Sequence, residues 1–401
     1  MSGTSSWLDD LKLRASWGKN GNQAISNTAR YGIYQADYGY NRMTSTAYDI
    51  YMQGSGIFPS GYRTTQTKND NLRWEEATQY NAGLDFTLLN QSLYGTLDIY
   101  KKDVKDMLIS PAFLGAIGEG GNSWHNGPSL VNKGIEFMIG YRKNINKDFS
   151  FDISANIDTY TNKVTSLPVY ATGSYEHTNT ETLIGRAYGS LVGYVYDGIF
   201  QTEEEAKNSG QKNARVGGIR YANLDDDPNI TDNDRTWILD PIPAFSYGVN
   251  VSLVYKNFDF SMFWQGVQGV DVHNTRKTQT DFWSVSDVGS NKGTRLLNAW
   301  SAENKGSSIP ALTTNNTADE GRMSTYLVED GSYLKLRSLQ VGYNLPKGIT
   351  QKIYSERIRF YASGQNIVTI KSSSFTGKDP ESPAWGYPIP KSFTFGVQID
   401  F

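Results

Sequence analysis

Strict alternation of apolar and polar residues is the feature that most constrains this chain. In residues 392–401, every second position from Phe393 to Phe401 is apolar, and the positions between them are mostly polar. Successive side chains of a β-strand point to opposite faces, so this segment predicts a strand with one apolar and one polar face. Taken alone, such a strand fits a soluble sandwich as well as a membrane barrel.

The same alternation recurs along the whole chain, at lengths that suit strands. It changes phase once, near Arg337 and Ser338, where we expect a β-bulge. The predicted strands are 11–18, 80–88, 93–100, 135–141, 149–158, 245–255, 258–264, 333–346, 357–363 and 392–401. The sequence therefore predicts an all-β protein with about ten strands.

The connections between these strands alternate between short and long. Short ones lie near Asn90, at 143–147, near Lys256 and at 346–355, and long ones cover 19–73, 109–129, 168–243, 275–332 and 371–391. Transmembrane β-barrels of bacterial outer membranes have short periplasmic turns and long extracellular loops. The alternation favours an antiparallel transmembrane β-barrel over a soluble sandwich, and it places Phe401 on the periplasmic side.

The composition is compatible with a barrel. Only 38% of the residues are hydrophobic, and no run approaches the ~20 apolar residues of a membrane helix; in a barrel only alternate residues of a strand meet lipid. The chain contains 26 tyrosines, 9 tryptophans and 17 phenylalanines, which suits aromatic girdles at the membrane interfaces. It has no cysteine, which excludes thiol catalysis, and its net charge of −3 without a basic run argues against nucleic acid as a partner.

Several short motifs, taken in their order, resemble a known family. They are WLDDLKLRASWG at 7–18, NLRWE at 71–75, NAGLD at 81–85, DIYK at 98–101, NKGIE at 132–136, GYVYDGIF at 193–200, SYLKLR at 332–337, GYNLP at 342–346 and GQN at 364–366. On these motifs the chain resembles the C-terminal part of SusC/RagA-type TonB-linked outer-membrane receptors.

The resemblance implies a TonB-dependent nutrient importer. Its 22-stranded barrel is plugged by an N-terminal domain, takes up oligosaccharides or peptides with a SusD-like surface lipoprotein, and is driven by the TonB complex. Residues 7–401 would be the C-terminal half of this barrel, set in outer-membrane lipid, with the plug, its TonB contact and the N-terminal strands outside this sequence. We expect no enzymatic activity, and no signal peptide, because Met1 is followed by neither a basic nor an apolar segment.

A second interpretation is a stand-alone ten-stranded outer-membrane barrel that acts as a hydrolase or an adhesin. Ten is an even strand number that such barrels adopt, and carboxylate-rich loops are compatible with acid–base catalysis. Against it, the sequence shows no paired nucleophile and base. The two interpretations differ in one structural point, because only a closed ten-stranded barrel pairs its first strand with its last.

Aromatic residues in the predicted loops are the candidate ligand-binding residues. Flat aromatic faces beside polar groups suit sugar rings or peptide side chains. The alternative is that these residues lie at the membrane interface or pack the loops against one another. The candidates are Trp124, Trp237, Trp283, Trp300, Trp385 and Tyr387.

The run NLDDDPNITDND at 223–234 resembles a calcium-binding loop. Its carboxylate and amide oxygens follow the spacing of an EF-hand loop. Pro228 takes the place of the glycine that makes the sharp turn, however, and proline does not reach a positive φ. We therefore favour an acidic, solvated turn, with calcium as the alternative. The candidate ligands are Asn223, Asp225, Asp227, Asn229 and Asp234.

Overall fold

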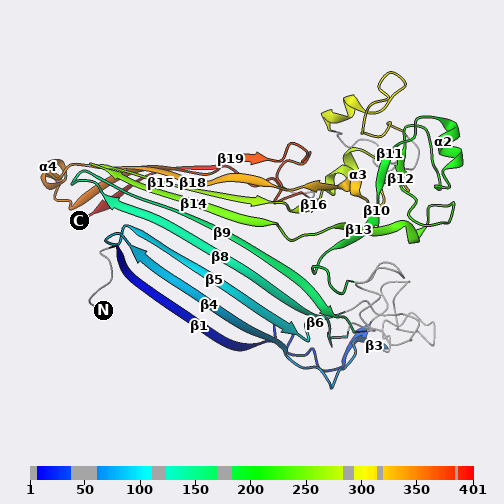
Figure 1. The fold of residues 1–401 in the computed structure, drawn as a ribbon, viewed down its shortest axis with the longest axis horizontal. Coiled ribbons are helices and arrows are strands. Elements are labelled where there is room, and N and C mark those ends of the chain that lie inside the picture. Colours follow the sequence, from blue (N-terminus) through cyan, green and yellow to red (C-terminus); the bar gives the residue numbers. More distant parts are fainter. Residues whose placement is uncertain are drawn as a thin grey trace, which may run out of the picture.

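A curved antiparallel sheet dominates the structure. The computed structural model describes residues 7–37, 61–110, 123–168, 183–282, 293–313, 319–383 and 387–401. Within these residues the main sheet has ten strands that follow one another in sequence order (Figure 1). They are β1 (Leu8–Asn22), β4 (Glu75–Leu88), β5 (Leu93–Lys105), β8 (Ser129–Asn144), β9 (Phe149–Ser166), β14 (Phe245–Tyr255), β15 (Phe258–Gln268), β18 (Tyr333–Asn344), β19 (Arg357–Lys371) and β20 (Ser392–Asp400).

Each predicted strand corresponds to one strand of this sheet. Most observed strands are longer than predicted, and the largest extensions are at the ends of β9, which continues past 158 to Ser166, and of β19, which continues past 363 to Lys371. Residues 159–166 read TYTNKVTS and carry no apolar alternation. The strand persists there because it pairs with β8 as far as Ser129, so tertiary pairing decides its length.

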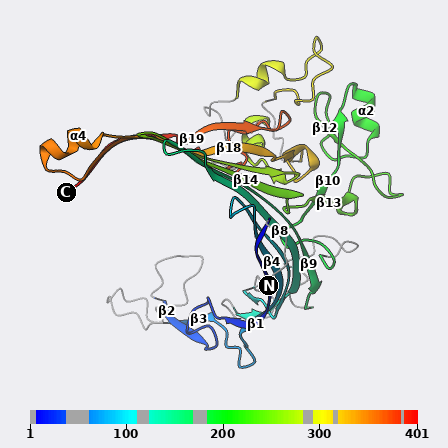
Figure 2. The same ribbon diagram turned by 60° about the vertical axis from the view of Figure 1, so that its left-hand side comes forward.

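The sheet is open. β1 pairs only with β4 and β20 only with β19 among the described strands, and the two edge strands do not pair with each other. Figure 2 shows the sheet as an arc rather than a closed ring. This arrangement agrees with part of a larger barrel and differs from the stand-alone ten-stranded barrel.

The hydrogen-bond register places residues of like polarity in rows across the sheet. The following residues, one on each strand in turn, form a row that is apolar throughout: Leu8, Leu88, Leu93, Tyr141, Ile153, Val251, Met262, Leu339, Gly364 and Phe393. One residue away lies a polar row on the opposite face: Asp152, Ser252, Ser261, Gln340, Ser363 and Thr394. The alternation read from the sequence is therefore continuous across neighbouring strands.

The two faces of the sheet differ in their surroundings. Large side chains of the apolar face are exposed, among them Leu13 at 81% and Phe395 at 80%. On the polar face, the Arg14 guanidinium bonds to Asp85 and to Asp98, each at 2.8 Å. An apolar face this wide, left open by the protein, is typical of a surface that meets lipid or a partner.

A β-bulge lies where the sequence changes phase. Leu336 pairs with Trp264 and Ser338 with Phe263, so Arg337 is an extra residue on β18. The neighbouring strand β19 adapts with Asn366, whose φ is 53°, a left-handed conformation that asparagine tolerates better than most residues. The bulge keeps the apolar residues of both halves of β18 on one face.

The long connections contain short strand pairs and helical turns, at one end of the sheet (Figure 1). Short strand pairs are β2 (Ile33–Asp37) with β3 (Gly61–Gln66), β6 (Leu108–Ile109) with β7 (His125–Asn126), β10 (Leu191–Tyr194) with β13 (Arg235–Leu239), β11 (Tyr196–Ile199) with β12 (Ile219–Tyr221), and β16 (Asp271–His273) with β17 (Val328–Asp330). Helical turns are α2 (Glu203–Asn208), η2 (Asp232–Asp234), α3 (Arg276–Thr280), η4 (Thr294–Asn298) and η5 (Thr325–Leu327).

The opposite end of the sheet carries the short turns and the C-terminus (Figure 1). Here α4 (Lys347–Thr350) and η6 (Gln351–Ile353) join β18 to β19. Lys256, with a φ of 53°, forms the tight turn between β14 and β15. Among the described residues, no helix has the length and apolar character needed to cross a membrane.

Candidate ligand-binding site

Two of the long connections fold together into one unit. Described parts of 183–243 and 271–332, which we call the loop lobe, share a buried core. The rings of Tyr194 and Tyr221 stack with their centroids 4.9 Å apart, and Tyr326 packs edge-on against Phe282 at 5.8 Å. This core consists of Tyr194, Ile219, Tyr221, Ile230, Phe282, Tyr326 and Leu327. The motif at 193–200 is thus a packing motif, because it supplies buried aromatic residues.

Polar contacts lock the two connections to each other. Arg215 Nε and Nη2 donate to the two carboxylate oxygens of Glu320, at 2.6 and 3.1 Å. The Tyr221 hydroxyl donates to the Glu320 carbonyl at 2.6 Å. Burial raises the pKa of the Glu320 carboxyl above its ordinary value, although Arg215 opposes the rise. A buried, two-pronged ion pair of this kind fixes geometry, because breaking it leaves a buried charge uncompensated.

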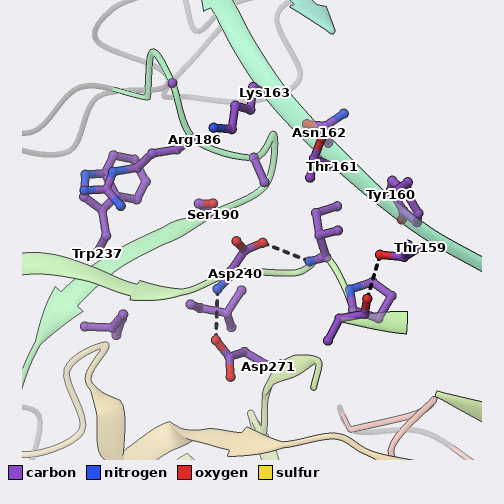
Figure 3. A pocket seen from close by; sticks show the side chains of 17 residues that line it. Thr159, Tyr160, Thr161, Asn162, Lys163, Arg186, Ser190, Trp237, Asp240 and Asp271 are labelled. Atoms are coloured by element: carbon purple, nitrogen blue, oxygen red, sulfur yellow. Dashed lines mark hydrogen bonds between the residues drawn. The ribbon is translucent and has the colours of Figure 1, made fainter. Parts of the chain in front are cut away.

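A polar pocket of about 560 Å³ lies where β14 separates from β9. The last paired residues of the two strands are Asp158 and Ser246. Beyond them, β9 forms one wall of the pocket, the segment 237–244 forms the other, and residues of 185–190 close one end (Figure 3). Its volume falls within the roughly 300–1,000 Å³ of small-ligand sites.

Trp237 of β13 is a predicted ligand residue that lines this pocket. The Arg186 guanidinium lies over its ring, 4.8 Å from the centroid, and holds the indole in place by a cation–π interaction (Figure 3). Trp237 Nε1 is buried and has no hydrogen-bond partner within the described part of the chain.

Charged residues of the pocket wall were not predicted from the sequence. Lys163 lies at one end, and Asp240 and Asp271 come from the opposite side (Figure 3). The Asp240 carboxylate accepts a bond from Ile242 N at 3.0 Å, and Asp271 accepts one from Asp240 N at 3.1 Å. In the described residues, none of the three takes part in an ion pair. They are far apart in sequence, and only the divergence of two strands brings them together.

The other predicted aromatic residues occupy separate places. Trp300 packs inside the loop lobe, where its Nε1 donates to Gln201 Oε1 at 3.0 Å. Trp124 is partly buried, and its carbonyl accepts a bond from Asn69 Nδ2 at 2.7 Å. Tyr387 is 98% exposed. Trp283 and Trp385 lie outside the described residues. For Trp300, packing between loops accounts for the position of the side chain.

The acidic run at 223–234 forms a series of turns stabilised by its own side chains. Oδ1 of Asn223, Asp225 and Asp227 each accepts a bond from the backbone nitrogen two residues later, at 3.2, 2.9 and 3.0 Å. Asn229 Nδ2 also donates to Asp227. Such turns explain why Asp and Asn recur at this spacing.

Asp234 closes the acidic run. It is fully buried, and its two oxygens accept bonds from Leu224 N and Thr231 N, both at 2.7 Å. Across the described residues no group of three or more His, Asp or Glu side chains is arranged to hold a metal ion. Calcium binding by this run remains a prediction. Residues 223–229 form exposed turns, whereas Asp234 is buried rather than solvated.

Proteins that resemble this chain in sequence and fold are outer-membrane receptors and transporters. Residues 3–367 match the family described as TonB dependent receptor-like, β-barrel. The chain belongs to this family. Like SusC and its relatives, it is an outer-membrane protein that crosses the bilayer with β-strands.

Individual relatives agree with the family. TonB-dependent receptor P3 of Formosa agariphila is 31% identical over 431 residues, which cover 99% of this chain and 40% of that protein. TonB-dependent receptor SusC of Bacteroides thetaiotaomicron is 29% identical over 409 residues, which cover 98% of this chain and 38% of that protein. The chain thus spans about two fifths of the length of the relatives that it matches.

The fold is also that of a solved transporter. A chain of the RagAB peptide transporter superposes with a TM-score of 0.78 over 100% of this chain and 41% of its own length, at 23% identity. This likeness is evidence for the fold. It supports the SusC/RagA resemblance drawn from the motifs, and with it a β-barrel arrangement of the ten strands.

Proposed function

We propose that the chain is part of a TonB-dependent importer that takes up oligosaccharides or peptides. The observation that carries the proposal is the apolar row that crosses all ten strands, on a face where side chains such as Leu13, Ile153 and Phe395 are exposed, opposite a polar face with fixed ion pairs. Such a sheet suits a barrel wall with lipid outside and a polar lumen inside. A barrel of 22 strands, completed by strands outside this chain, would close the open edges β1 and β20.

The loop lobe is the part that we propose to meet cargo and a SusD-like lipoprotein on the cell surface. Long structured loops on a rigid barrel are where binding usually takes place. The lobe lies at the end opposite the short turns and the C-terminus (Figure 1), and short turns face the periplasm in such barrels. Its packed core would keep the binding surface in one shape.

An uptake experiment in cells tests the proposal. The intact receptor and a form that lacks 275–332 are expressed in a strain without the native gene, and uptake of labelled oligosaccharides and peptides is measured. The intact receptor should restore uptake only when TonB is present. The deletion should abolish uptake and leave the barrel assembled, as judged by heat-modifiable migration in gels.

The opposite results would reject the proposal. Uptake that persists without TonB would exclude energised import, and unchanged uptake after the deletion would reduce this region to scaffold. Loss of heat-modifiable migration would call for a milder variant of the lobe, such as Leu297→Asp, because Leu297 is exposed and lies outside the lobe core.

A further inference from the structure

The wall of the pocket formed by β9 is an open strand edge. In β9, Val164 N donates to Arg186 O and Val164 O accepts from Gly185 N, both at 2.8 Å. Val164 therefore directs its backbone groups away from β8. Backbone groups of alternate residues point to the same side of a strand, so those of Tyr160 and Asn162 point the same way, into the pocket.

Among the residues that the structure describes, these backbone groups have no partner on the pocket side. Asp158 pairs with Ser246 of β14 at one end of the gap, and Val164 bonds to 185–186 at the other. Between them, no bond in the described chain reaches the backbone groups of Tyr160 or Asn162 from the side opposite β8; Tyr188 N bonds instead to the side-chain oxygen of Asn162, at 2.8 Å. Within the described chain, two N–H and two C=O groups thus remain unpaired, in the geometry of a sheet.

The gap has a definite length. Six residue steps separate Asp158 from Val164, and at ~3.3 Å a step they span roughly 20 Å. The contact of Thr159 Oγ1 with Ala244 O, at 2.8 Å, closes one end, and the bonds of Val164 close the other. A long polypeptide does not pass through such a window, but a strand of about three residues fits into it.

Unpaired charges give the gap a direction. Lys163 lies at the end near Val164, while Asp271 lies on the opposite side of the pocket, beyond Asp240 (Figure 3). A free carboxylate is favoured beside Lys163 and a free amino group beside the two aspartates. A peptide whose carboxylate lies beside Lys163, at the Val164 end of the gap, runs parallel to β9. The neighbouring bridge between Val164 and Ile184 is also parallel.

We propose that this pocket binds short peptides with free ends, about three residues long, as an added strand on the edge of β9. Backbone bonds to Tyr160 and Asn162 supply affinity that is independent of side chains. Lys163 selects the peptide carboxylate, and Asp240 with Asp271 selects the amino group. The proposal rests on the proposed import function for its setting and narrows the cargo of this pocket to peptides.

Calorimetric titration of the intact receptor in detergent tests this site. The probe is the tripeptide Ala-Val-Ala with free ends, compared with its C-terminal amide, its N-acetyl form and a form methylated on the central backbone nitrogen. Saturable binding of the free tripeptide is expected, weakened about fivefold or more by each change, since each removes one charge or one backbone donor.

Matched variants link the binding to this pocket. Lys163→Gln should weaken binding of the free tripeptide about fivefold and leave binding of the C-terminal amide unchanged. Asp240→Asn should weaken binding of the free tripeptide by a similar factor and leave binding of the N-acetyl form unchanged. Lys147→Gln and Asp148→Asn, on the exposed turn between β8 and β9, should change nothing. The methylated peptide is tested on the unmodified receptor. The backbone contacts can therefore be tested even if a variant fails to fold.

Three results would overturn the proposal. They are no saturable binding of the free tripeptide, equal binding of the methylated peptide, or tripeptide affinity unaffected by both pocket variants. Maltotriose that binds more tightly than the tripeptide and loses binding in Trp237→Ala would assign the pocket to sugars instead. Because binding is measured without TonB or a lipoprotein, a receptor that binds but does not import would refute the importer, whereas import without tripeptide binding would refute the site.

Discussion

Neighbouring residues of β20 face opposite sides of the sheet. Val397 pairs with Phe360 on the apolar face, and Gln398 pairs with Arg359 on the polar face. Val397→Arg in the intact receptor should lower the free energy of unfolding by about 2–4 kcal/mol if the residue lies near the middle of the bilayer, and less toward the interface. Gln398→Arg should have a much smaller effect. Urea unfolding in lipid vesicles measures both, and equal losses would contradict the assignment of faces.

Gly342 of β18 lies beneath an ion pair that crosses the strand. Arg359 Nε donates to Asp259 Oδ2 at 2.9 Å, and a Cβ on Gly342 would collide with the carboxylate and the guanidinium. Gly342→Ala should therefore cost about 1–3 kcal/mol of unfolding free energy, as overpacking does. At Gly348 an added Cβ meets nothing within 4 Å, so Gly348→Ala is the control. A loss shared by both variants would mean that the ion pair is not responsible.

Single residues show how far the sequence can predict this site. Alternation identifies which residues of Phe393–Phe401 share a face, because each strand repeats the rule locally. Trp237 was predicted as an aromatic of a loop, and it lines the pocket. Lys163 and Asp240 gave no signal, because a lone charge in a polar segment is ordinary. Their place in one pocket depends on where two strands part, which is a property of the packed fold.

At the scale of elements, the connection after β19 is fastened onto β18. Lys335 of β18, 1% exposed in its side chain, bonds to Asp379 at 2.6 Å and to Glu381 at 2.5 Å. Tyr333 and Arg337 also donate to Glu381. Burial alone would raise the pKa of Glu381, but these hydrogen bonds outweigh it and lower the pKa to about 2.

This fastening predicts a pH dependence. The folded pKa of Glu381 is depressed from 4.5 to about 2, so its stabilisation is complete above about 4.5 and is lost as the pH falls toward 2. The full contribution is on the order of 2–3 kcal/mol. Protection of residues 372–383 from hydrogen exchange, corrected for intrinsic rates, should therefore fall between pH 6 and pH 3 in the intact receptor.

A variant separates this group from general acid effects. Glu381→Gln should lower the protection of 372–383 at pH 6 and remove most of its pH dependence, because the amide does not titrate. Glu356→Gln, at an exposed carboxylate with no ion pair within the described residues, should leave both unchanged. If protection in Glu381→Gln still falls with pH as in the unmodified receptor, another carboxylate controls the segment.

The elements also explain where sequence analysis stops. All ten strands follow from alternation and the bulge from a change of phase, because both are local rules. The end of β9 was placed too early, since 159–166 lacks alternation and is held in the sheet by β8. The pocket lies along this polar extension. A strand predicted only from its apolar pattern therefore ends just before the part that carries the candidate site.

At the scale of the whole molecule, the loop lobe is built from two separate connections of the main sheet. One connection bridges β9 and β14, the next bridges β15 and β18, and their side chains form a single core. The sequence presents them as two separate loops. Deleting 275–332 removes Phe282, Tyr326 and Leu327 from that core, so the deletion reports on the whole lobe rather than on one loop.

The shared core predicts that one substitution loosens both connections. Glu320→Ala leaves the Arg215 guanidinium partly buried without its carboxylate and removes an acceptor of Ile219 N, a loss of about 3–5 kcal/mol for a buried pair. Limited proteolysis of the intact receptor should then cut within both 183–243 and 293–332, while the heat-modifiable barrel persists. Glu303→Ala, at an exposed carboxylate that contacts Ser301, is the control. Cleavage confined to 293–332 would mean that the two connections fold independently and that the lobe is not one unit.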